Sequence, residues 1–160
     1  MNEVEAIRKH FRPDRITTLF VGESAPASGK FFYYGNTKLF REMRKALNAN
    51  EDFLTEFKTE GFYLDDLVLS PVNKLGKKEK KQAHEASVSP LSIRIRDYQP
   101  ATIVVVGLGI QVFVQKAAEL ARFNGPIYSV HFPNWPESVK SFHTKMSEIK
   151  PTLRGATSIE

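Results

Sequence analysis

The sequence has no cysteine among its 160 residues. Disulfide bridges, thiolate catalysis and cysteine-bound iron–sulfur clusters are therefore excluded. Apolar runs are short, and none reaches the roughly 18 residues needed to span a bilayer. The first residues, Met-Asn-Glu-Val-Glu, are acidic, unlike the basic start of a signal peptide. These absences predict a cytoplasmic protein that has no membrane partner.

Metal and cofactor signatures are also scarce. No two histidines have the spacing of metal ligands on one helical face, so we expect no metal site. The segment "GLG" at 107–109 lacks the third glycine of a dinucleotide-binding motif, because Val112 stands in its place. The segment "GESAP" at 22–26 lacks the closing glycine of a serine hydrolase motif. We therefore expect no cofactor.

Positive charge is what the chain has in excess. Lysine and arginine number 23 against 18 for aspartate and glutamate, and the net charge of +5 favours anionic partners. Five lysines fall within the segment "NKLGKKEKKQAHEAS", namely Lys74, Lys77, Lys78, Lys80 and Lys81. We expect this segment to be a solvated, mobile loop whose lysines can contact phosphates without reading sequence.

The alternation of apolar patterns predicts the fold. Four apolar, β-branched runs indicate buried strands, at 16–21, 62–69, 103–106 and 127–130. Helical patterns precede, separate and follow them, at 4–11, after Asn36, at 110–122 and after Pro136. This order is typical of an α/β fold, and we expect a three-layer α/β/α sandwich with a central, mainly parallel four-stranded sheet. We assign residues 1–150 to a single domain and residues 151–160 to a C-terminal tail.

Ligands of such sheets bind beyond the carboxyl ends of the strands. The loop after the first strand, "VGESAPASGKFFYYGN", is unusual in its small residues and its run of four aromatics. Gly22 allows a sharp turn, and Pro26 stiffens the loop. The aromatics at 31–34 either offer flat faces on which a planar ligand can stack or pack the loop onto the sheet.

Four segments, in this order, resemble the motifs of the uracil-DNA glycosylase superfamily over about 120 residues. The segment from Gly22 to Pro26, with the aromatics, Asn36 and Phe40, is similar to the first motif. "GFYLDDLVLSPVNK" resembles the second strand with its exit turn, and "PATIVVVGLG" resembles the third strand. "YSVHFPNWPES" resembles the last strand and its His-Pro-Ser motif. The spacing of the first motif is closest to the mismatch-specific branch, and its Gly-Glu pair resembles the thermostable iron–sulfur branches.

The resemblance implies that a base is flipped out of DNA into a pocket, where its glycosidic bond is broken. The base would stack on Phe32, or else on Phe31, in a site that includes Gly22 and Asn36. His131 stands where the histidine of the family donates a hydrogen bond to the base and stabilises its developing negative charge. Taken without the resemblance, His131 would be an ordinary strand-end histidine that caps a carbonyl.

The resemblance also implies contacts with DNA, double-stranded or single-stranded, made by a monomer. Trp135, beside Asn134, follows in the loop that wedges into the helix in the family. It would either fill the gap left by the flipped base or pack the loop. The lysines of the segment above, Lys77, Lys78, Lys80 and Lys81, would neutralise phosphates that flank the flipped nucleotide.

This chain departs from the family pattern at two positions that carry chemistry. The residue that positions water in the family is Asp or Asn, whereas this chain has Ser24 or Ala25 there. Glu23 is the nearest carboxylate, so Glu23 and Ser24 join His131 as candidate catalytic residues. The asparagine that reads the base is replaced by Asp66, and an ionised carboxylate cannot donate to a uracil carbonyl. The identity of the base therefore stays open.

Two classes of function remain. The first is a monofunctional DNA glycosylase of base excision repair, which hydrolyses the N-glycosidic bond of uracil or another deaminated base. The second is a non-catalytic module on the same scaffold that binds nucleic acid or a free nucleobase. The missing water-positioning residue keeps the second class open.

Overall fold

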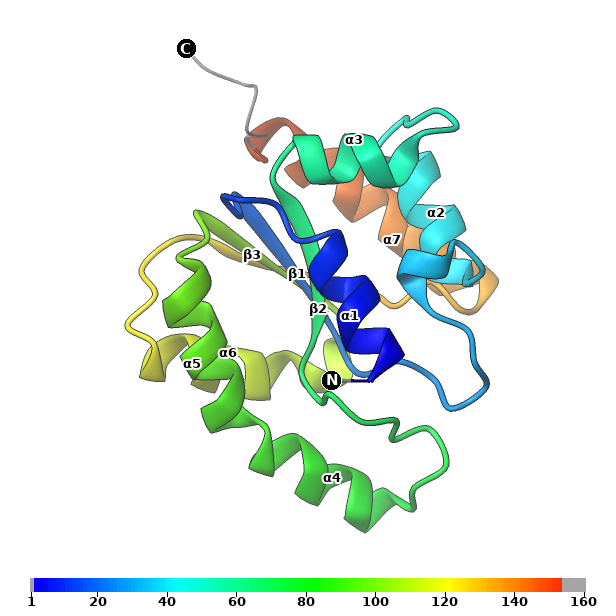
Figure 1. Cartoon of the computed structure of the whole chain (residues 1–160). Helices are drawn as coiled ribbons and strands as arrows, with labels where there is room; N and C mark the ends of the chain where they lie inside the picture. Colours follow the sequence, from blue (N-terminus) through cyan, green and yellow to red (C-terminus); the bar gives the residue numbers. More distant parts are fainter. Residues whose placement is uncertain (1, 154–160) are drawn as a thin grey trace.

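The computed structural model describes residues 2–153, which form a central sheet covered by helices on both faces (Figure 1). The strands are β1 (Thr18–Gly22), β2 (Phe62–Asp66), β3 (Thr102–Val106) and β4 (Ile127–Val130). All pair in parallel, in the order β2-β1-β3-β4. The first three strands are buried along their whole length, as expected for strands covered on both faces. The predicted four-stranded parallel sheet is confirmed.

The helices divide into two layers, which confirms the α/β/α sandwich (Figure 1). One layer contains α2 (Lys38–Ala46), α3 (Phe53–Thr59) and α7 (Pro136–Ile149). The other contains α5 (Val88–Tyr98) and α6 (Gln111–Leu120), which pack against each other. The remaining helices are α1 (Glu3–His10), α4 (Lys77–Ala86) and the 3₁₀ turns η1 (Phe32–Tyr34), η2 (Leu108–Ile110) and η3 (Lys150–Thr152). Across residues 2–153, no helix has the length and apolar character needed to cross a bilayer.

Local sequence signals explain where the helices begin. The Thr37 hydroxyl caps α2 by accepting a hydrogen bond from the backbone N–H of Phe40 at 3.1 Å. Leu39 and Met43, four residues apart, are the buried face of this helix. Pro136 occupies the first position of α7, where its missing N–H and fixed φ are favourable. Each of these helices therefore starts at the carboxyl edge of the sheet and runs back along it.

One aromatic side chain pairs with the backbone at the outer edge of β2, which is the first strand of the sheet order. The Tyr33 hydroxyl accepts a hydrogen bond from the Leu64 N–H at 2.7 Å and donates one to the Leu64 carbonyl at 3.0 Å. Unpaired backbone groups on an edge strand would otherwise need water or another strand. The aromatic run after β1 therefore completes the edge of the sheet.

One expectation about the loops is wrong. The lysine-rich segment is not a mobile loop, because Lys77, Lys78, Lys80 and Lys81 form the first turns of helix α4. Of the two alternatives for the aromatics at 31–34, packing is the one observed for the first three, which are buried, and only Tyr34 is exposed. Of the predicted tail, Pro151 and Thr152 belong to η3 and are exposed, and Leu153 packs against the core, whereas residues 154–160 lie outside the described part of the chain.

Candidate functional site

An open cavity of about 910 Å³ lies at the carboxyl edge of the sheet. Its walls come from the loops after all four strands and from the start of α2. The chain passes from β1 to β2 on one side and places β3 on the other, so neighbouring loops diverge there and leave a crevice. The fold alone therefore favours this edge as the ligand site.

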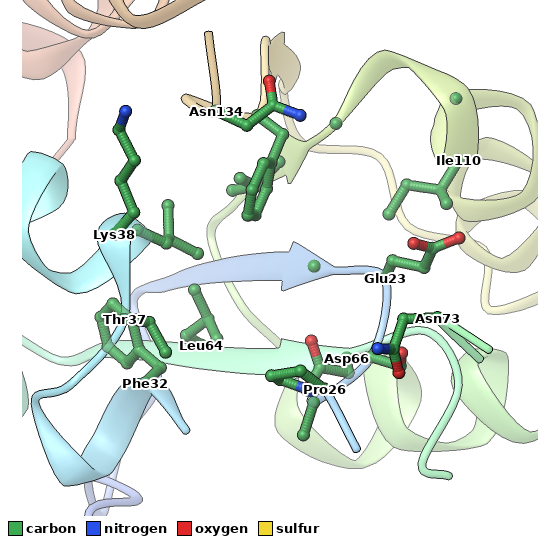
Figure 2. A pocket seen from close by; sticks show the side chains of 18 of the residues that line it. Glu23, Pro26, Phe32, Thr37, Lys38, Leu64, Asp66, Asn73, Ile110 and Asn134 are labelled. Carbon is green, nitrogen blue, oxygen red and sulfur yellow. The ribbon is translucent and has the colours of Figure 1, made fainter. Parts of the chain in front are cut away.

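Most of the residues predicted for the site line this cavity. They are Gly22, Glu23, Ser24, Phe31, Phe32, Asp66, Lys80, His131, Asn134 and Trp135. The expected convergence of the first loop, the end of the second strand and His131 is observed. Figure 2 shows Glu23 beside Ile110, with Thr37 and Lys38 on the other side of the cavity. Asn36, Lys77, Lys78 and Lys81 are not among the lining residues.

Gly22 and Asp66 lie side by side in register at the ends of β1 and β2. A Cβ atom on residue 22 would stand only 2.8 Å from Asp66 Oδ1, so any larger residue would force this carboxylate to shift. The other carboxylate oxygen, Oδ2, accepts a hydrogen bond from Arg8 Nη1 at 3.0 Å. Burial raises the pKa of Asp66 to about 6, with a further increase from Asp65, while the Arg8 charge opposes the shift.

Asp65 has a structural role. Its Oδ2 accepts hydrogen bonds from Arg94 at 2.7 Å and from the Tyr98 hydroxyl at 3.0 Å, and both donors lie on α5. Consecutive residues of a strand point to opposite faces, so only one of the two aspartates reaches the cavity. The pair therefore anchors α1 and α5 to β2 through Arg8 and Arg94.

The predicted stacking residues are less available than expected. Phe31 is 2% exposed and lies beneath the Arg8 guanidinium, which is 5.1 Å from its ring centroid. Phe32 is 4% exposed and packs against Phe40, Phe53 and Phe57. Both rings belong to the cavity wall as well as to the core, so the run is mainly a packing element. Rings that are buried in this way cannot also offer an open face on which a base could stack.

Asn36 has a different role from the predicted one. It neither caps α2 nor lines the cavity, because its Oδ1 accepts the Phe31 N–H at 2.8 Å. This hydrogen bond closes the turn that contains η1. Asn36 therefore shapes the loop that carries the aromatics, and its effect on the cavity is indirect.

Glu23 has a partner that the sequence did not reveal. Its Oε2 lies 2.7 Å from Nε2 of His84, which is a buried residue of α4. The hydroxyl of the adjacent Ser24 accepts a long hydrogen bond, 3.4 Å, from the Val72 N–H. Reading the lysine-rich segment as a helix would have placed His84 on the same face as Lys80, four residues earlier, but would not have revealed its pairing with Glu23.

His131 follows β4 directly and is exposed on the cavity rim. The next turn presents Phe132 and Trp135, which are 43% and 70% exposed. The turn is fixed by Ser138, whose hydroxyl accepts the Trp135 N–H at 2.9 Å and donates to Asn134 Oδ1 at 3.0 Å. Large apolar side chains therefore stand in water at the mouth of a pocket, as is common where a partner docks.

The mouth of the cavity is electropositive. Lys30, Lys38 and Lys80 line it, and the N-terminal ends of α2 and α7 face it. Helix N-termini carry partial positive charge and free N–H groups, so they favour anions. The side chains that face the cavity include two carboxylates, Glu23 and Asp66, which lie inside this basic rim.

Comparisons with known proteins add no further assignment. No protein-family model matches the chain, and no curated protein sequence matches it either. The likeness to the uracil-DNA glycosylase superfamily therefore remains a prediction from the four segments. No group of three metal-binding side chains occurs among the residues that the structure describes.

Proposed function

We propose that the protein is a monofunctional DNA glycosylase that hydrolyses the N-glycosidic bond of a flipped, deaminated base. One observation carries the proposal: Glu23, Asp66 and His131 line one cavity whose basic rim bears an exposed tryptophan. Those three residues come from the ends of different strands, and each supplies a function that the reaction needs.

In this mechanism the base enters the cavity and its polar edge meets Asp66. As the C1′–N bond breaks, the sugar becomes cationic and negative charge grows on the base. His131 donates a hydrogen bond to the base oxygen and stabilises that charge, as donors aimed at a developing anion do. The exposure of His131 leaves its ring free to make this contact.

The rim accounts for the DNA around the flipped base. Trp135 fills the gap left in the stack, since its indole is exposed and its turn is fixed by Ser138. Lys30, Lys38 and Lys80 neutralise phosphates on either side of the flipped nucleotide. Backbone contacts of this kind fix the register of the protein without reading sequence.

A cleavage assay tests the proposal. Labelled duplexes carry one uracil, hypoxanthine, xanthine or mismatched thymine, and heating in alkali breaks any abasic site formed under single-turnover conditions. We expect cleavage of at least one substrate, and a loss of about 10²-fold in rate for His131→Ala, because one transition-state donor is removed. His10→Ala, on α1 and outside the cavity lining, is the matched control and should cut at the wild-type rate.

The alternative is a non-catalytic module that binds a nucleobase or nucleic acid in the same cavity. It is supported by Ser24 and Ala25, neither of which can act as a base at the position where the family carries Asp or Asn. The same assay separates the two functions. A protein that binds the modified duplexes and cuts none of them has the binding function.

A further inference from the structure

We propose that Glu23 is the general base that activates the attacking water and that His84 is the residue that positions it. The inference rests on the proposed glycosylase function. Ser24 or Ala25 stands where the family carries the Asp or Asn that positions water, and the inference assigns that step to Glu23. It also adds a histidine from helix α4 to the site.

Glu23 is the better placed of the two carboxylates in the cavity. Its side chain is 39% exposed, so water and substrate can reach it. The Asp66 side chain is 7% exposed, and one of its oxygens is held by Arg8. A base must accept a proton from a water molecule next to the sugar, and only an accessible oxygen can do so.

The backbone and the side chain of Glu23 are both fixed. Its carbonyl accepts the Val68 N–H at 2.9 Å, which extends the pairing of the two strands beyond their ends. Its Oε2 is bonded to His84, and no hydrogen bond among residues 2–153 engages Oε1. One oxygen is therefore oriented by the protein while the other is free for water.

His84 is held in place from two sides. It is the buried residue of α4, and its ring lies 5.2 Å from the ring of Phe113 on α6. An ionised Glu23 accepts the hydrogen bond, so Nε2 of His84 carries the proton. The histidine thus fixes the carboxylate much as a catalytic base is commonly oriented by a third group.

The step balances as a hydrolysis. Glu23 Oε1 takes a proton from water, and the oxygen lone pair forms the new bond to C1′. The C1′–N bond breaks, and its electron pair leaves with the base, whose charge His131 stabilises. The base then takes up a proton from solvent, and Glu23 returns its proton to solvent. The products are the free base and an abasic sugar.

A purely structural reading of the pair has different consequences. His84 is the main buried contact of α4, so the pair could serve only to hold this helix against the cavity. An anchor of this kind does not depend on a hydrogen-bond donor near Nε2, so His84→Gln would then lose as much activity as His84→Ala. The other charged or titratable side chains that line the cavity are Lys30, Lys38, Asp66, Lys80 and His131, and Lys116 lies over the Phe113 ring. All are retained in the variants below.

The experiment compares Glu23→Gln, His84→Ala and His84→Gln with wild type in single-turnover cleavage from pH 5 to 9. Glu23→Gln should lose at least about 10²-fold, because the base is gone. His84→Ala should lose about 10-fold or more, because the Glu23 carboxylate is no longer held in position. His84→Gln keeps a donor near the position of Nε2 and should recover most of the rate.

A second histidine–glutamate pair provides the control. His143 Nε2 lies 2.7 Å from Glu42 Oε1 between α7 and α2, and neither residue lines the cavity. His143→Gln should therefore cut at the wild-type rate with an unchanged pH profile. A loss in His143→Gln as large as that in His84→Ala would mean that both pairs affect the cleavage rate only through stability, and the inference would be overturned.

Binding of two abasic analogues gives a second measurement of the role of Glu23. Wild type should bind a duplex with a protonated pyrrolidine, which imitates the cationic sugar, about 10-fold more tightly than one with neutral tetrahydrofuran, and Glu23→Gln should lose this preference.

The cleavage results distinguish failure of this inference from failure of the proposed function. If wild type cuts but Glu23→Gln cuts equally well, only the inference is overturned. If His84→Ala matches wild type in rate and pH profile, His84 is an anchor of α4. If wild type cuts no substrate, the proposed catalysis and the inference both fall, whether or not the analogues bind.

Discussion

Asp66 stands where the family pattern has an asparagine, and this exchange of an amide for a carboxyl changes which groups the site can recognise. Asparagine offers a donor and an acceptor, whereas an ionised aspartate only accepts. Burial raises the pKa of Asp66 to about 6, so this carboxyl gains its proton not far below neutral pH. The protonated form can donate to a carbonyl, as asparagine does. A carboxyl at this position can therefore read different base edges on the two sides of that pH.

The same shift predicts a pH dependence of stability. Because the pKa of Asp66 is raised from 3.8 to about 6, the folded protein binds more protons than the unfolded chain within this window. The contribution of Asp66 to the free energy of unfolding should therefore fall as the pH rises from 4 to 6. Urea unfolding of wild type and Asp66→Asn between pH 4 and 7 measures it. We expect the stability difference to move in favour of Asp66→Asn with rising pH, and a constant difference would contradict the shift.

Sequence reasoning found single residues where a strand end marks them. His131 directly follows an apolar run, and the resemblance marks Asp66 as the residue at the end of the second strand, so the expected convergence on one edge of the sheet could be inferred. His84 and Arg8 could not be found in this way, because their partners are 61 and 58 residues distant. Pairing over such distances depends on how α1 and α4 pack, which no local pattern encodes.

At the scale of elements, the strands were predictable and three helices were not. All four strands are short and lie within apolar runs, and the first three are buried along their whole length, so composition identifies them. Helices α3, α4 and α5 were missed. Helix α4 is the clearest example. It is rich in lysine, buries only His84 and has no apolar stripe by which a helix is usually recognised. A polar helix of this kind looks like a loop in sequence.

Helix α4 carries a prediction about DNA affinity. Lys80 lines the cavity, and the other lysines, Lys77, Lys78 and Lys81, lie on the same two turns. Replacing all four with glutamine should weaken binding similarly on every sequence. If two phosphates are contacted at a time, the slope of log K against log salt should become shallower by about 2. Fluorescence anisotropy across a salt series measures the slope.

The control for α4 removes equal charge from the far edge of the sheet. The control residues lie at the edge of the sheet opposite the cavity. Lys45, Arg122 and Lys150 lie at or just beyond the ends of α2, α6 and α7, and Lys58 lies shortly before the start of β2. Their replacement with glutamine should leave the slope within error of wild type. Equal slopes for both quadruple variants would show that α4 gives no specific contact to DNA.

The loop after β1 carries a prediction about stability. Tyr33→Phe removes the hydroxyl that pairs with both backbone groups of Leu64 at the edge of β2. A buried donor and acceptor then lose their partner, and we expect a loss of about 1–3 kcal/mol in the free energy of unfolding. Tyr34→Phe, at an exposed ring, should change it by less than about 0.5 kcal/mol. Urea unfolding compares the two, and equal effects would mean that the edge is closed by other contacts.

At the scale of the whole molecule, the strand order decides where the chemistry can occur. The alternating pattern predicts parallel strands and helices on both faces, but the order β2-β1-β3-β4 follows only from the structure. This order puts β1 in the centre, with β2 on one side and β3 on the other. The loop that holds Glu23 therefore faces both Asp66 and the turn after β4, and a single cavity results.

The central claim is that this cavity releases a base from DNA. Mass spectrometry of single-turnover reactions with the uracil, hypoxanthine, xanthine and mismatched-thymine duplexes tests it most directly, because it detects the free base itself. We predict one equivalent of free base for each abasic site formed with at least one of these substrates, and almost none with His131→Ala over the same time. No free base from any of the duplexes, with binding retained, would contradict catalysis and leave a protein that only holds the base.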